Sequence, residues 1–95
     1  TIIRRLSPVV RPEGEVSEHF VHAPWFLIET IDREKQQVIK RDYVENEYTT
    51  QERKKGLLVG NWLLSLKPDE VVIPDGSTGT AVALLRKAGV EIRSA

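Results

Sequence analysis

The spacing of apolar residues changes from the period of a strand to the period of a helix near the middle of the chain. Before residue 49, short runs rich in β-branched and aromatic residues predict strands over residues 2–6, 25–31 and 37–44. Beyond it, apolar residues recur every three or four positions over residues 57–66, which is the spacing of an amphipathic helix. A chain that combines these two patterns is predicted to be an α/β domain.

The second half of the chain alternates helix and strand. A capping-box pattern over residues 49–52 predicts the start of the first helix. Residues 70–73 predict a short buried strand, residues 80–88 a second helix that ends at Gly89, and residues 90–93 a last strand. The strand–helix–strand order at the end indicates parallel pairing there.

These elements together predict a mixed five-stranded sheet. The two strands around the polar tip at residues 32–35 predict a hairpin at one side of the sheet, and its second strand has the charged composition of an edge strand. Gly56 and Gly60 lie four positions apart inside the first helix, where glycine costs about 1 kcal/mol relative to alanine. We therefore expect these glycines to mark a close contact between that helix and the sheet.

Length and composition limit the classes of protein to which the chain can belong. Its 95 residues predict one domain over residues 1–95, and no apolar run approaches the ~20 residues of a membrane span. The 14 basic and 14 acidic residues balance, which argues against a nucleic-acid partner. Without cysteine, the chain alone supplies no disulfide and no thiolate ligand. The absence of methionine favours a domain excised from a longer protein, and the absence of a signal-peptide core favours a cytoplasmic location.

Residues 13–26 hold both histidines of the chain together with carboxylates and aromatic residues. The candidate metal ligands are Glu18, His19 and His22, because two imidazoles and a carboxylate suit a divalent transition metal such as zinc or iron. A helical turn here would place the two histidines on one face. The alternative is an ordinary polar loop in which Phe20 and Trp25 fill the core, and the spacing alone favours that alternative.

A second loop, with the sequence Gly76-Ser77-Thr78-Gly79, joins a strand to a helix N-terminus. Free backbone N–H groups at such a position can bind an anion. The loop lacks the lysine and the spacing of a phosphate-binding loop, so the sequence favours a helix cap. No Ser, His and acidic residues are spaced as a catalytic set, and the chain is not expected to be an enzyme.

The early segment resembles the dinitrogenase iron–molybdenum cofactor biosynthesis family, also called nitrogenase accessory factor-like domains. The resemblance lies in Val-Ser-Glu-His-Phe at residues 16–20 and Ala-Pro-Trp-Phe-Leu-Ile at residues 23–28, with weaker similarity at residues 55–63 and 88–92. The chain has Val21 where the family has glycine.

The resemblance implies a ribonuclease H-like, three-layer α/β/α fold and non-enzymatic binding of an iron–sulfur or heterometal cluster. His19 would contact the cofactor, and His22 would lie nearby. The implied cofactor-binding residues around it are Ser17, Phe20, Gly76, Ser77 and Thr78.

Residues 12–20 look most like the version of this domain that is fused behind the membrane helices of cation diffusion facilitator transporters. That narrower resemblance implies a cytoplasmic regulatory domain that binds a divalent metal, contacts the transmembrane domain of its own chain and forms a homodimer. Two alternatives stay open: a free-standing carrier of the iron–molybdenum cofactor, and a metal-free oligomerisation module that pairs through the edge strand at residues 37–44.

Overall fold

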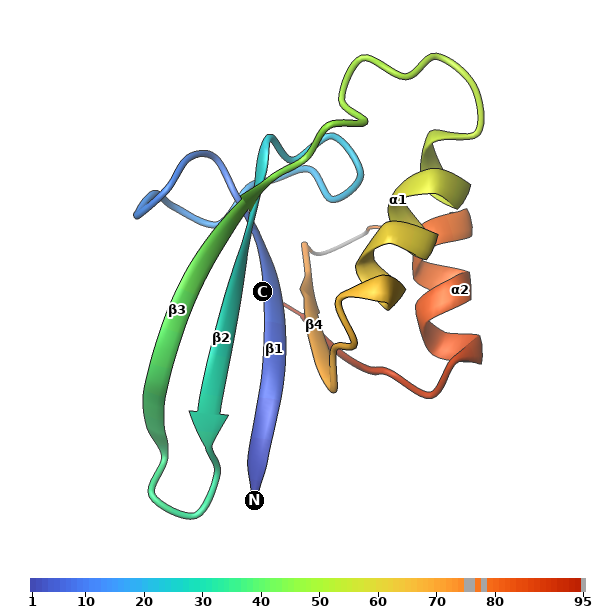
Figure 1. Cartoon of the computed structure of the whole chain (residues 1–95). Helices are drawn as coiled ribbons and strands as arrows, with labels where there is room; N and C mark the ends of the chain where they lie inside the picture. The colour runs from blue at the N-terminus through green and yellow to red at the C-terminus, as the bar shows by residue number, and fades with distance from the viewer. Residues whose placement is uncertain (75–76, 78, 95) are drawn as a thin grey trace.

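A computed structural model describes residues 1–74, 77 and 79–94 of the chain. Each element predicted from the sequence is present, and the elements follow one another in the predicted order (Figure 1). Their bounds are β1 (Ile2–Val9), β2 (Trp25–Asp32), β3 (Gln37–Glu45), α1 (Lys55–Ser65), β4 (Glu70–Ile73), α2 (Thr80–Lys87) and β5 (Glu91–Ser94).

The strands form one mixed sheet in the order β3-β2-β1-β4-β5. β2 is antiparallel to both β1 and β3, whereas β4 is parallel to both β1 and β5. The mixed five-stranded sheet, the parallel pairing near the end of the chain and the hairpin at one edge are therefore confirmed. β3 is the free edge of the hairpin, and most of its side chains are exposed, as its charged sequence predicts.

Both helices pack on the same face of the sheet (Figure 1). Their apolar residues join those of the strands in one core cluster, which comprises Leu6, Phe20, Ala23, Phe26, Ile28, Val59, Leu63, Val71, Ile73, Ala81, Val82 and Leu85. Within the described residues the fold thus has two layers, and no helix of that part covers the opposite face. The predicted three-layer arrangement is therefore not observed in the described residues, because both helices lie on one face; the ribonuclease H-like label stays a prediction.

Two boundaries differ from the sequence prediction by more than one residue. β1 continues through Pro8 to Val9, because its pairing with β4 covers only Arg5 and Leu6 and requires no N–H from Pro8, whose carbonyl accepts from the Ser17 N–H at 2.8 Å. The predicted capping box over residues 49–52 is wrong: α1 begins at Lys55, and Lys54 precedes it with a left-handed φ of 57° and no side-chain cap. The backbone turns instead at Tyr48, whose carbonyl accepts a hydrogen bond from the Gln51 N–H at 3.0 Å.

Gly56 and Gly60 mark a close contact, but the partner is helix α2 and not the sheet. A Cβ atom on Gly60 would lie 3.1 Å from the Ala81 Cα and 2.8 Å from the Leu84 Cδ1. A Cβ atom on Gly56 would lie 3.2 Å from the Thr80 Cβ. The two glycines therefore allow the two helices to approach side by side over the sheet.

A Gly60→Val substitution is expected to lower the free energy of unfolding by about 1–3 kcal/mol, the cost of overpacking a close contact. The valine would push α2 away because the Ala81 backbone cannot yield as a side-chain end can. Urea denaturation followed by circular dichroism measures the change. Gly89→Ala is not a suitable control, since Gly89 has a φ of 84°. The matched control is Ala83→Val on the exposed side of α2, which should change the free energy of unfolding by less than about 1 kcal/mol.

Candidate functional site

The histidine-bearing segment leaves the sheet at the carboxyl end of β1. Figure 1 shows that the connections from β1 to β2 and from β3 to α1 lie at this same end, where the parallel strand β4 also ends. In open α/β sheets the carboxyl ends of parallel strands are the usual place for a ligand. The fold therefore places the predicted site at the expected edge.

His19 and His22 come together on one turn of this segment. The Ala23 N–H donates to the Phe20 carbonyl at 3.2 Å and closes the turn. The two imidazole rings lie edge to face, with their centroids 6.3 Å apart. Both histidines are exposed, so the pair predicted from their spacing forms a two-imidazole surface that an external ligand can reach.

Ser17 and Phe20 hold the turn in place and do not face solvent. Ser17 is 4% exposed, and its hydroxyl oxygen accepts a hydrogen bond from the His19 N–H at 3.1 Å. Phe20 is 5% exposed and packs edge to face on Phe26, which in turn packs on Trp62. The two residues therefore position the histidines. The family resemblance implied that both bind the cofactor, whereas the alternative favoured by the spacing placed Phe20 in the core.

Asn46, which directly follows β3, anchors the turn, and nothing in the sequence singles it out. It is 3% exposed, and its amide nitrogen donates to the carbonyls of Val21 at 3.0 Å and Ala23 at 2.9 Å. Its amide oxygen accepts from the Tyr48 N–H at 3.0 Å. One side chain thus fixes both the histidine turn and the segment that leads into α1.

Lys55 is the second residue that sequence reasoning missed. Its ammonium nitrogen lies 2.8 Å from the His22 Nδ1 and donates to the Thr49 carbonyl, also at 2.8 Å. An ammonium group can only donate, so the His22 Nδ1 accepts and the ring proton is assigned to Nε2. The outward edge of His22 then presents an N–H donor beside a positive charge.

The predicted three-ligand set of Glu18, His19 and His22 is not assembled. Across residues 1–74, 77 and 79–94, no three His, Cys, Asp or Glu side chains are grouped closely enough to hold a metal ion. A protein-held zinc ion takes three or four protein ligands, and the Lys55 ammonium disfavours a bare cation at His22. The donor set does not fit a resident metal ion.

The loop at residues 76–79 shows fewer features of a binding site. Gly76 and Thr78 lie outside the described residues. Ser77 is half-buried and lines an open depression of about 230 Å³ with Gly79 and Arg86 near the start of α2. No side-chain oxygen in the described part of the chain caps α2, whose N-cap residue is Gly79, so the expected cap is not observed.

Three comparisons with known proteins bear on the site. A family model described as dinitrogenase iron-molybdenum cofactor matches residues 6–95. The apo form of the orange protein from Desulfovibrio gigas is 21% identical, with a TM-score of 0.75 over 96% of this chain and 73% of that one. An NMR structure of a Thermotoga protein of the DUF35 family is 26% identical, with a TM-score of 0.67 over 95% of this chain and 73% of that one. No curated protein sequence matches significantly.

Across the described residues, neither helix has the length and apolar character required to cross a membrane.

Proposed function

The chain belongs to the dinitrogenase iron-molybdenum cofactor family, and from that membership we propose that it is a non-enzymatic carrier of an anionic metallocofactor. His19 and His22 are its contact residues. The cargo class is an iron–sulfur or heterometal cluster, as the family description suggests. The observation that carries the proposal is the exposed pair of imidazoles beside the Lys55 ammonium.

The charge at the site decides between two kinds of cargo. A free divalent cation would meet the Lys55 charge and would find two imidazoles without a third ligand. A cluster with a net negative charge would instead be attracted by the ammonium and could accept a hydrogen bond from the His22 Nε2–H. Because an assembled cluster brings most of its own ligands, two contacts and a nearby cation suffice to hold it.

The structural support for a carrier is that one set of residues holds the histidine turn in place and a different set is free to contact the cargo. Ser17, Phe20 and Asn46 are buried and fix the turn, whereas both histidines stand in solvent. An exposed and rigid contact surface allows cargo to be received and passed on without closing an active site. A carrier needs no catalytic set, in line with the sequence expectation that the chain is not an enzyme.

The experiment is a titration with tetrathiomolybdate, a dianion of molybdenum and sulfur, followed by its visible absorption. We expect a His19→Ala, His22→Ala double variant to weaken binding by at least about 10-fold, the loss of two charge-assisted contacts. The matched control is an exposed pair outside the loop, Gln51→Ala with Asn61→Ala, which should leave binding unchanged. Equal binding by the double variant and the unaltered chain would falsify the site assignment.

A calorimetric titration with Zn²⁺ and Mn²⁺ separates the carrier from the narrower transporter interpretation. A cytoplasmic regulatory domain of a cation diffusion facilitator would bind a divalent ion through the histidines, and the carrier would bind the dianion in preference. The transporter fusion, the homodimer and the cytoplasmic location stay predictions. Light scattering at increasing concentration tests the homodimer and the metal-free oligomerisation module.

A further inference from the structure

Strand β3 forms one edge of the sheet, and in the described part of the chain no strand pairs with its outer side. The Asn46 N–H donates to the Pro24 carbonyl at 2.9 Å, which shows which residues of β3 bond toward β2. Because bonding and non-bonding pairs alternate along an antiparallel ladder, Asp42 also bonds toward β2. The N–H and C=O groups of Arg41 and Tyr43 therefore point outward, where a further strand can bind them.

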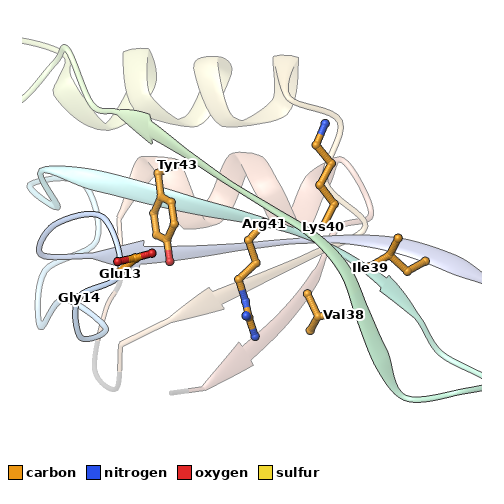
Figure 2. Close-up of a pocket in the computed structure, with 7 residues that line it drawn as sticks. All are labelled: Glu13, Gly14, Val38, Ile39, Lys40, Arg41 and Tyr43. Atoms are coloured by element: carbon orange, nitrogen blue, oxygen red, sulfur yellow. The ribbon is translucent and has the colours of Figure 1, made fainter.

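The outer edge of β3 is accessible to a partner. In Figure 1 both helices lie toward β4, and neither borders the outer side of β3. Figure 2 shows Arg41 and Tyr43 on one face of β3 and Lys40 on the other. Lys40 and Asp42 are exposed, and the Lys40 Nζ lies 3.5 Å from the Asp42 Oδ2. Outward backbone groups and charged side chains are thus both accessible along residues 39–43.

The sequence of this edge is complementary to its own reverse. When two copies of β3 run antiparallel with Arg41 opposite Arg41, Lys40 of each copy lies opposite Asp42 of the other. The same register places the exposed Ile39 opposite Tyr43 on each side of the axis, which adds apolar contacts. The outward N–H and C=O groups of the two Arg41 residues then face one another, so the hydrogen-bond pattern of the sheet continues. We propose that β3 pairs in this way with β3 of a second copy of the chain and forms a homodimer.

Charge selects this register over its neighbours. A shift of the axis by one residue would place Lys40 opposite Lys40 or Asp42 opposite Asp42, and like charges directly opposite one another destabilise a strand pair. The two Arg41 residues also face each other, but each guanidinium is paired with the Glu29 carboxylate of its own chain at 3.3 Å. Charged residues on an edge strand normally prevent pairing with other strands. Here their order permits a second copy of this chain and disfavours a strand that lacks the reverse pattern.

The proposed pairing defines the geometry of the dimer. Opposite residues differ by an even number of positions, so side chains that lie on one face in the first copy lie on the same face in the second. The two sheets therefore join into one sheet of ten strands, five from each copy, with α1 and α2 of both copies on one face. Asn46, which holds the histidine turn, follows the carboxyl end of β3. The two histidine turns then lie at opposite ends of the paired strands, and the pairing does not depend on what they bind.

The test measures the mass of the full chain by sedimentation equilibrium from about 10 μM to about 1 mM. We expect a dissociation constant on the order of 100 μM, because the contact is short. Lys40→Glu or Asp42→Lys alone should weaken dimerisation by at least about 10-fold, since each sets two pairs of like charges opposite one another. An equimolar mixture of the two variants should regain the dimer, because the new glutamate of one variant then faces the new lysine of the other.

Lys35→Glu and Glu52→Lys are the matched controls: they make the same changes of charge at exposed positions outside β3 and should leave dimerisation unchanged. The side chains of Lys40 and Asp42 are 68% and 51% exposed, so both β3 variants should keep the circular dichroism spectrum of the unaltered chain. Amide shifts of the unaltered chain should change with concentration along residues 39–43 and not in the helices. An unaltered chain of monomer mass at about 1 mM, a mixture of folded variants that stays monomeric, or shifts confined to the helices would each overturn the proposal.

Discussion

An Asn46→Ala variant is expected to lose about 3–5 kcal/mol of unfolding free energy, an effect large enough to unfold much of a small domain at 25 °C. The substitution leaves the carbonyls of Val21 and Ala23 and the Tyr48 N–H without their partner. A buried polar group that loses its hydrogen bond costs about 1–3 kcal/mol, and three such groups are affected here. Urea denaturation followed by tryptophan fluorescence measures the change, since Trp62 packs on Tyr48.

Two further variants separate the hydrogen bonds from the size of the side chain. Asn46→Asp keeps the acceptor for Tyr48 but sets a carboxylate against two carbonyl oxygens, so its loss of stability should match or exceed that of alanine. Asn61→Ala makes the same chemical change at an exposed position in α1 and should be neutral or slightly stabilising because of the helix propensity of alanine. A loss below about 1 kcal/mol in Asn46→Ala would show that water replaces the lost partners and that Asn46 does not anchor the histidine turn.

Apolar patterning predicted the elements of this fold well because most of them contribute apolar side chains to the core. β4, over Glu70–Ile73, was predicted with the bounds that it has, since an apolar run between polar segments has few other uses. The start of α1 was mispredicted because two other contacts fix the chain at Tyr48 before the helix begins: the side chain of the nearby Asn46 accepts from the Tyr48 N–H, and Trp62, further along the chain, packs on the Tyr48 ring. The capping-box pattern lost to these contacts.

Part of the geometry of the candidate site, the pairing of the two histidines, could be predicted from local spacing. The spacing of His19 and His22 suffices to place both on one turn, because three residues complete most of a helical turn. Lys55 is 33 positions from His22, and only the packing of α1 beside the turn brings its ammonium to the ring. The sequence thus indicated that the two histidines lie together, whereas the position of the Lys55 ammonium beside them depends on the fold.

The Lys55 ammonium is the basis of the second prediction: a Lys55→Glu variant should prefer a divalent cation to an anion. Replacing the ammonium beside His22 with a carboxylate turns attraction of an anion into repulsion, and we expect tetrathiomolybdate to bind about 10–100-fold more weakly. The same carboxylate, added to two imidazoles, supplies the third ligand that a zinc ion needs, so Zn²⁺ binding should become measurable by calorimetry.

Three controls make this outcome specific to the position of the charge. Lys55→Met removes the charge at similar length and should give intermediate anion binding without zinc binding. Lys87→Glu makes the same change in net charge at the far end of α2 and should alter neither titration. The new carboxylate favours the dipole of α1, whose first turn has no acidic residue, but the variant also loses the hydrogen bond to the Thr49 carbonyl, so urea denaturation of each variant accompanies the titrations. Unchanged tetrathiomolybdate affinity in Lys55→Glu would mean that the cargo does not lie against His22, whatever the family to which the chain belongs.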